Sequence, residues 1–192
     1  GLLHTRCARK GVVLRTPLST LEKLLAPAHA AVVLGAMNGP VLGNAVEVMQ
    51  ALGHSRGVAL QGVDGGIVPW VSRRTRGVAI DQGHLVPLVV DPRDFGLEHD
   101  SEPELPMYGP PEDDEGACDN PSLVAAAQKA TQEVLSGVHN SARDAALMGA
   151  GVILKAVGLS PTLAEGVDLA AQALDGGAVT ERIAHLSDLI GQ

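Results

Sequence analysis

The residues best suited to binding chemistry stand in one short stretch, GVDGG, at positions 62–66. Its three glycines and one carboxylate follow the run GVALQ directly. A glycine-rich turn after a strand can present backbone N–H groups to an anion. A plain tight turn is the alternative interpretation. The residues of this candidate phosphate or ligand loop are Gly62, Asp64, Gly65 and Gly66.

The stretch lacks the signatures of the common phosphate loops. GVDGG is not a G-x-G-x-x-G pattern, and no lysine follows it as in a Walker loop. Hard cations recruit several oxygen ligands, whereas the side chains of Ile67 and Val68, which come next, supply none. The seven histidines are scattered without the spacing of metal ligands. No metal or other cofactor is therefore predicted from these residues.

Arginines near this stretch are candidate contacts for phosphate groups of a nucleotide or nucleic acid. They are Arg56, Arg73, Arg74 and Arg76. Trp70 is the single aromatic residue among them that could stack on a base. The alternative interpretation is that these arginines only lie at the solvated end of a strand. Arg15, before an expected helix start, is placed to bind a carboxylate or phosphate, with a helix-end ion pair as its alternative.

The formal net charge of -8 is concentrated in one segment. Residues 98–119 hold nine of the 22 acids and no Lys or Arg, so the rest of the chain is nearly neutral. The run Glu112–Glu115 could hold a divalent cation, but acid runs in Pro-rich loops are more often solvated. Strong nucleic-acid binding usually needs a positively charged surface. The nearly neutral charge outside residues 98–119 does not favour such a surface.

Length and composition indicate one α/β domain over residues 1–192. Aromatic residues make up only 2%, so Ala, Val, Leu and Ile must fill the core. No apolar run approaches the roughly 20 residues of a membrane span, so no membrane association is expected. Cys7 and Cys118 stand far apart, which favours a reduced, cytoplasmic chain over a disulfide. Gly1 is not an initiator Met, which leaves open whether the chain is a piece of a longer protein.

The residues that start and end the apolar segments predict a βαβ unit followed by a hairpin. Buried strands at 30–36 and 57–62 flank a helix that starts at Asn38-Gly39-Pro40 and ends at Gly53. Such a unit implies parallel pairing. Strands at 77–80 and 85–90 are joined by the DQG turn at 81–83.

A long acidic, Pro- and Gly-rich loop is expected at 91–120. Four helices follow it, beginning at Asn120, at Asn140 or Ser141, at Ser160-Pro161 and at Thr180. The predicted fold is α/β, with a mostly parallel sheet of βαβ units, a short antiparallel hairpin and a C-terminal helical cluster.

Several stretches together resemble one known family. They are LRTPLSTLEKLLAPA at 14–28, VVLGAMNGPVLGNAVEVMQALGHSRGVALQGVDGG at 32–66, DPRDFGL at 91–97, and the helices at 141–151 and 163–178. They are similar to the C-terminal portion of the anthranilate phosphoribosyltransferase family, glycosyltransferase family 3 in the broad sense. The amino-acid sequence of the first stretch, at 14–28, is most similar to that of divergent paralogues in this family that bind nucleic acid.

The resemblance implies transfer of phosphoribosyl from phosphoribosyl pyrophosphate to the amine of anthranilate, in tryptophan biosynthesis. Catalysis there is mostly positioning and charge neutralisation, with metal-assisted departure of pyrophosphate. Arg15 falls on the family arginine associated with anthranilate, and Ser19 falls on a family asparagine in the same segment. Both are therefore candidate substrate-binding residues.

The chain also departs from the family pattern. The adjacent Asp-Glu pair that holds magnesium in the family falls on Ile67 and Val68, which cannot bind it. The family's pyrophosphate loop is found nowhere in the 192 residues. Phosphoribosyl pyrophosphate and an aromatic amine are thus expected partners only if family activity is retained, and the isolated chain is predicted to be inactive. A non-catalytic nucleic-acid-binding protein is the alternative, and homodimerisation stays open.

Overall fold

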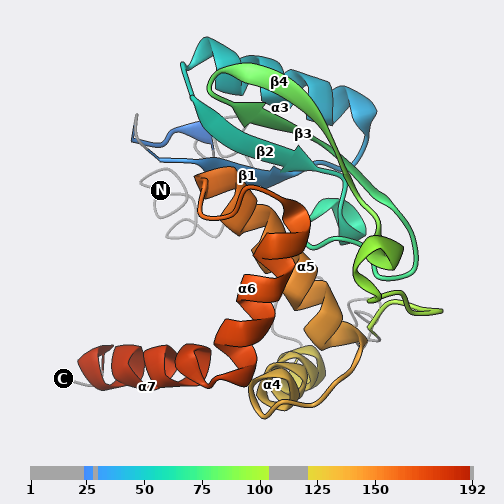
Figure 1. Ribbon diagram of the computed structural model, residues 1–192, viewed down its shortest axis with the longest axis vertical. Helices are drawn as coiled ribbons and strands as arrows, with labels where there is room; N and C mark the ends of the chain where they lie inside the picture. Colours follow the sequence, from blue (N-terminus) through green and yellow to red (C-terminus); the bar gives the residue numbers. More distant parts are fainter. Residues whose placement is uncertain (1–23, 28–29, 104–120, 191–192) are drawn as a thin grey trace, which may run out of the picture. The chain divides into compact units, whose positions relative to one another are not determined.

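The computed structural model describes residues 24–27, 30–103 and 121–190. The elements are β1 (Val32–Gly35), α3 (Gly39–Ala51), β2 (Arg56–Leu60), β3 (Thr75–Asp81), β4 (His84–Val90), α4 (Pro121–Leu135), α5 (Ser141–Val157), α6 (Leu163–Asp175) and α7 (Ala178–Ile190) (Figure 1). They confirm the predicted α/β class. The described residues form two compact units. The first unit runs up to Ile67 and includes Arg76–Leu88, and the second contains Val68–Thr75 and the residues from Val89 onward.

The sheet of the described residues has the strand order β1-β2-β3-β4. It is mixed, whereas a mostly parallel sheet was expected. β1 and β2 are parallel, with Val33 opposite Val58. β2 and β3 are antiparallel, with Val58 opposite Ala79. Parallel strands need a long crossover, and α3 supplies it between β1 and β2. No such helix lies between β2 and β3, so the chain returns in the opposite direction.

Helix α3 begins and ends where its sequence signals predicted. The side chain of Asn38 accepts a hydrogen bond from the N–H of Val41 at 3.1 Å, which caps the first turn. Gly53 lies just beyond the helix with a φ of 78°, a left-handed conformation that suits glycine. The predicted βαβ unit is therefore confirmed at both helix ends.

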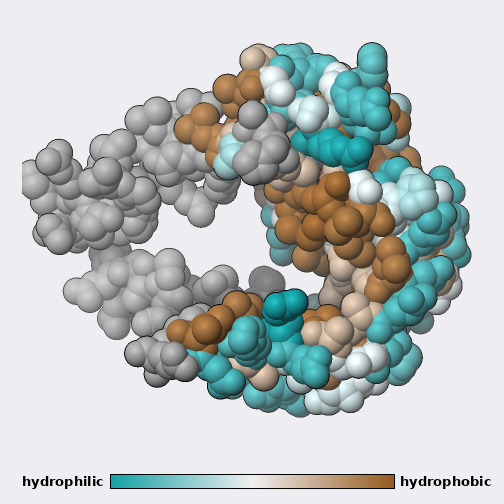
Figure 2. Space-filling view, turned by 60° about the vertical axis from the view of Figure 1, so that its left-hand side comes forward, coloured by the Kyte–Doolittle hydropathy of each residue, from teal (hydrophilic) through white to brown (hydrophobic). Residues whose placement is uncertain are grey.

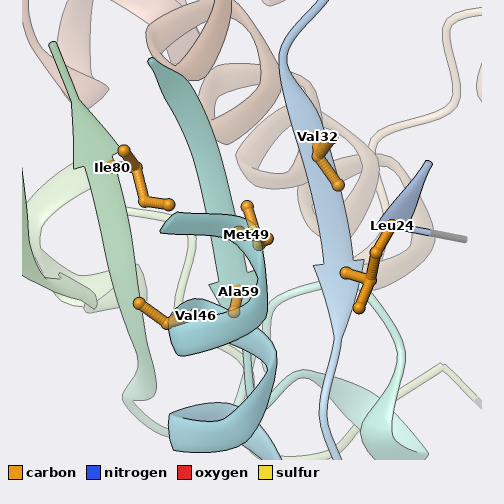
Figure 3. Close-up of a cluster of buried hydrophobic side chains, with 6 residues drawn as sticks. All are labelled: Leu24, Val32, Val46, Met49, Ala59 and Ile80. Atoms are coloured by element: carbon orange, nitrogen blue, oxygen red, sulfur yellow. The ribbon is translucent and has the colours of Figure 1, made fainter. Parts of the chain in front are cut away.

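The core of the first unit lies between α3 and the sheet. Its buried side chains are Leu24, Val32, Val46, Met49, Ala59 and Ile80 (Figure 3). Met49 fits because the facing strand has a glycine: a Cβ on Gly57 would lie 2.4 Å from the Met49 Cε. Small and aliphatic residues thus fill this core without aromatic side chains, as the composition predicted.

The turn between β3 and β4 has the conformation expected of a tight hairpin. Gln82 and Gly83 have φ angles of 49° and 83°. Positive φ at both central residues is typical of a type I′ turn, whose twist matches that of the flanking strands. The predicted hairpin turn at 81–83 is confirmed.

The second unit contains the C-terminal helices. Asn140 caps α5 by accepting from the N–H of Arg143 at 2.9 Å, and Thr162 caps α6 by accepting from the N–H of Glu165 at 3.1 Å. The two helices approach closely at a pair of glycines, because a Cβ on Gly166 would lie 2.8 Å from the Gly151 carbonyl oxygen. The predicted helical cluster is confirmed.

Several predicted features lie outside the described residues. These are Arg15, Ser19, Cys7, Cys118 and the acid run Glu112–Glu115. Within the described part of the chain, no helix has both the length and the apolar character needed to cross a bilayer.

Candidate functional site

The candidate loop after β2 folds as a tight turn. The N–H of Gly65 donates to the Gly62 carbonyl at 3.1 Å, that of Gly66 to Val63 at 2.8 Å, and that of Gly62 to Gly66 at 3.2 Å. Asp64 has a φ of 49°, in the left-handed region. All three glycine N–H groups are engaged within the turn, which is the geometry of the plain-turn alternative. A role in binding a ligand stays a prediction.

The turn packs against the end of the neighbouring parallel strand. A Cβ on Gly35, the last residue of β1, would lie 2.2 Å from the Gly65 carbonyl oxygen. A Cβ on Gly65 would lie 2.2 Å from the Met37 Sδ. The turn therefore lies at the carboxyl end of the parallel pair, the edge where α/β proteins commonly bind ligands.

The side chains at this edge are mostly apolar. Met37 is 71% exposed and Ile67 is also exposed, whereas Asp64 is the only carboxylate of the turn. The side-chain oxygen of Asn38 is already used to cap α3. Magnesium requires a near-octahedral set of oxygen ligands. These donors do not fit such a site, and nowhere in residues 24–27, 30–103 and 121–190 do three or more His, Cys, Asp or Glu residues gather into a metal-binding group.

The four arginines predicted as candidate phosphate contacts are divided between the two units. Arg56 begins β2 opposite Asp81, whereas Arg76 is next to Gly77, which lies opposite Leu60 at the far end of β2. These two arginines therefore lie at opposite ends of the β2–β3 pair. Arg73 and Arg74 belong to the second unit.

The loop at 69–75 in the second unit is fixed by hydrogen bonds. Trp70 donates its backbone N–H to the Thr75 hydroxyl at 2.8 Å. The carboxylate of Glu102 accepts from the N–H groups of Val71 and Ser72, and from the Ser72 hydroxyl at 2.7 Å. The guanidinium of Arg73 lies 3.8 Å from the Trp70 ring centroid.

Asp91 joins two arginines at the end of β4. Its Oδ2 accepts from Arg74 Nε at 2.5 Å and from Arg93 Nη2 at 2.8 Å, and its Oδ1 accepts from Arg93 Nε at 2.9 Å. Although Asp91 is only 4% exposed, hydrogen bonds from Arg93 and then Arg74 hold the pKa of its carboxyl well below the usual range. The same pairing raises the pKa of Arg93.

The sequence predicts only part of the cluster formed by Asp91, Arg74 and Arg93. Asp91 followed by Pro92 has the signature of a helix start, and its side chain does cap the one-turn helix Pro92–Phe95. Its pairing with Arg74, 17 residues earlier in the chain, has no local signal.

A second charged network links three segments of the second unit, and it was not predicted either. His99 Nε2 lies 2.7 Å from Asp144 Oδ2. Arg143, which is buried, lies near Asp144 and donates to Asp175 Oδ1 at 2.8 Å. This network ties α5 to α6 and to the segment that follows β4.

Comparison with known proteins gives one consistent family. The glycosyl transferase family, a/b domain, matches residues 1–180. The anthranilate phosphoribosyltransferase of Methylobacterium radiotolerans is 31% identical over 187 residues, which are 97% of this chain and 50% of that protein. That of Brevibacillus brevis is 26% identical over 192 residues, which are 100% of this chain and 52% of that protein.

Solved structures agree in fold. The anthranilate phosphoribosyltransferase of Thermus thermophilus has a TM-score of 0.62 and 27% identity, over 92% of this chain and 48% of that one. The Saccharomyces cerevisiae enzyme in complex with PRPP and Mg has a TM-score of 0.67 and 22% identity, over 96% of this chain and 50% of that one. The second likeness shows the fold alone.

The chain spans about half the length of the curated relatives it matches, which fits the predicted correspondence to a C-terminal portion. The names of these relatives give no support to a likeness with nucleic-acid-binding paralogues, which stays a prediction. The chain belongs to the glycosyl transferase family, a/b domain, together with the anthranilate phosphoribosyltransferases that it resembles.

Proposed function

We propose that this chain is the α/β part of a cytoplasmic phosphoribosyltransferase-like protein. Its reaction class is transfer of phosphoribosyl from phosphoribosyl pyrophosphate (PRPP) to the amine of anthranilate, in tryptophan biosynthesis. The observation that carries this proposal is the 31% identity, over 97% of the chain, with an anthranilate phosphoribosyltransferase. Because the chain spans only half of that relative, the complete activity belongs to the proposal as well.

The isolated chain is proposed to lack turnover. The yeast structure with PRPP and Mg shows that a protein of this fold binds the metal. Here the turn after β2 supplies one carboxylate, and its glycine N–H groups are used internally. These residues do not fit a magnesium site, so no reaction step is assigned to the metal. Arg15 and Ser19 stay in the proposal as substrate-binding residues.

An anthranilate fluorescence assay tests this proposal. The chain is incubated with PRPP, anthranilate and magnesium, and the M. radiotolerans enzyme serves as the positive control. The expected result is no loss of anthranilate fluorescence beyond the protein-free rate. Magnesium-dependent loss that scales with the concentration of the chain would show that the isolated chain is an active transferase.

Nucleic-acid binding is the second candidate function. Arg73 stacked on Trp70, beside the exposed Arg74, offers a cation and an aromatic ring in a fixed loop. Fluorescence anisotropy with a single-stranded oligonucleotide tests it. Binding should weaken steeply with salt and with Arg73→Ala, but not with Arg56→Ala, because Asp81 lies opposite Arg56 in the β2–β3 pair and offsets its charge. Equal effects of the two substitutions would contradict a role for this loop.

A further inference from the structure

We infer that Arg74 and Arg93, held by Asp91, form a binding site for a small phosphate-bearing anion, such as inorganic phosphate or pyrophosphate. All three residues belong to the second unit, whereas the turn at 62–66 belongs to the first. The inference does not depend on transferase activity, because it concerns binding alone.

The cluster brings two guanidinium groups to a single carboxylate oxygen. Arg74 Nε and Arg93 Nη2 both donate to the same oxygen, Asp91 Oδ2, at 2.5 and 2.8 Å. Two guanidinium groups thus share one carboxylate. Like charges this close repel each other, and a second anion that contacts both groups relieves the repulsion.

The hydrogen-bonding capacity of the two arginines is only partly used. Among the described residues, Arg74 is hydrogen bonded through Nε alone, which leaves both of its terminal amino groups. Arg93 uses Nε and Nη2, which leaves Nη1. The side chains are 63% and 54% exposed, so a ligand can reach them. A guanidinium fork matches the geometry of phosphate oxygens.

The site is pre-organised by a buried group. Asp91 is fixed at the end of β4, where it also accepts from the backbone N–H of Arg93 at 3.2 Å. An ionised carboxylate in a buried position must keep its partners, since burial without them is costly. The two guanidinium groups are therefore held in place before a ligand arrives, and this lowers the entropic cost of binding.

Neighbouring acids limit the size of the ligand. Glu98 lies 3.9 Å from Arg93 Nε, and the charges of Glu98 and Asp94 both act on Arg93. In a polyanion bound near Arg93, these carboxylates would repel the additional phosphate groups. A small anion avoids this repulsion if it binds chiefly to the two terminal amino groups of Arg74, with Arg93 beside it. The chemistry thus favours phosphate or pyrophosphate over a nucleic-acid strand.

Isothermal titration calorimetry with sodium pyrophosphate, and separately with inorganic phosphate, tests the site in low-salt buffer. The wild-type chain should bind at least one of them. Arg74→Gln should weaken binding about tenfold or more, since it removes charge-assisted hydrogen bonds. Arg74→Lys keeps the charge and the ion pair but loses the fork, so an intermediate loss is expected. Arg182→Gln on α7 removes the same charge elsewhere and should leave binding unchanged.

Three outcomes would overturn the inference. The first is no binding of either anion by the wild-type chain. The second is an equal loss in Arg74→Gln and Arg182→Gln, which would indicate nonspecific attraction. The third is Arg74-dependent binding of a single-stranded oligonucleotide without binding of either small anion, which would assign the arginines to a nucleic-acid surface. The titration contains no anthranilate, so its result stands apart from that of the transferase assay.

Discussion

At the scale of single residues, Asp91 shows how one carboxylate can organise a surface. It follows β4, caps the helix Pro92–Phe95 and pairs with two arginines from different segments. Each role satisfies part of its hydrogen-bonding capacity, which is why the carboxylate can be buried in ionised form. The same bonds define the positions of the guanidinium groups of Arg74 and Arg93.

Replacing Asp91 by Asn should lower the melting temperature at neutral pH. Asparagine still caps the helix but removes the charge that both arginines share. Because the folded-state pKa of Asp91 is depressed, its stabilisation is complete above the unfolded pKa of about 3.9 and is lost as pH falls through the folded value. The difference between variant and wild type should stay constant from about pH 7 to 5 and shrink below about pH 4. A difference that grows at low pH would contradict this account.

Gly35 and Gly43 form a matched pair for testing the turn at 62–66. A Cβ on Gly35 would lie 2.2 Å from the Gly65 carbonyl oxygen, whereas a Cβ on Gly43 in α3 meets nothing within 4 Å. Gly35→Ala should therefore cost about 1–3 kcal/mol in the free energy of unfolding. Gly43→Ala should stabilise by about 0.5–1 kcal/mol through helix propensity. Chemical denaturation measures both, and a neutral Gly35→Ala would mean that the turn does not pack on β1.

At the scale of elements, local signals were sufficient to predict most helices and strands. Asn38 and Asn140 each cap a helix through their own side chain at the predicted start. Helix α6 begins at Leu163 after its cap Thr162, slightly beyond the predicted start at Ser160-Pro161. Strand pairing and ion pairs join distant segments and leave no local signal. For example, no local pattern indicates that the register of β2 and β3 places Arg56 and Arg76 at opposite ends of this pair.

The exposed apolar residues of α7 give a test of how the helices pack. Hydrophobic side chains appear among hydrophilic ones on the visible face of the molecule (Figure 2). Leu186 on α7 is 48% exposed, whereas Met148 on α5 is fully buried. Leu186→Gln should change the free energy of unfolding by less than about 0.5 kcal/mol. Met148→Ala should cost about 2–5 kcal/mol. A large cost at Leu186 would mean that α7 is covered in solution.

At the scale of the whole molecule, family membership and local chemistry carry different information. The family match covers residues 1–180, and the fold agrees with solved transferases. The donors at the carboxyl end of β1 and β2 do not fit magnesium, which a transferase of this fold binds together with PRPP. A shared scaffold can lose its chemistry, because function depends on the site and not on the fold.

The proposed lack of turnover is tested most directly by the fluorescence of anthranilate incubated with the 192-residue chain, PRPP and magnesium. Fluorescence should fall no faster than in the protein-free control, while the M. radiotolerans enzyme consumes anthranilate under the same conditions. Magnesium-dependent consumption by the chain alone would refute this proposal. Such a result would show that this half-length chain contains a complete catalytic site.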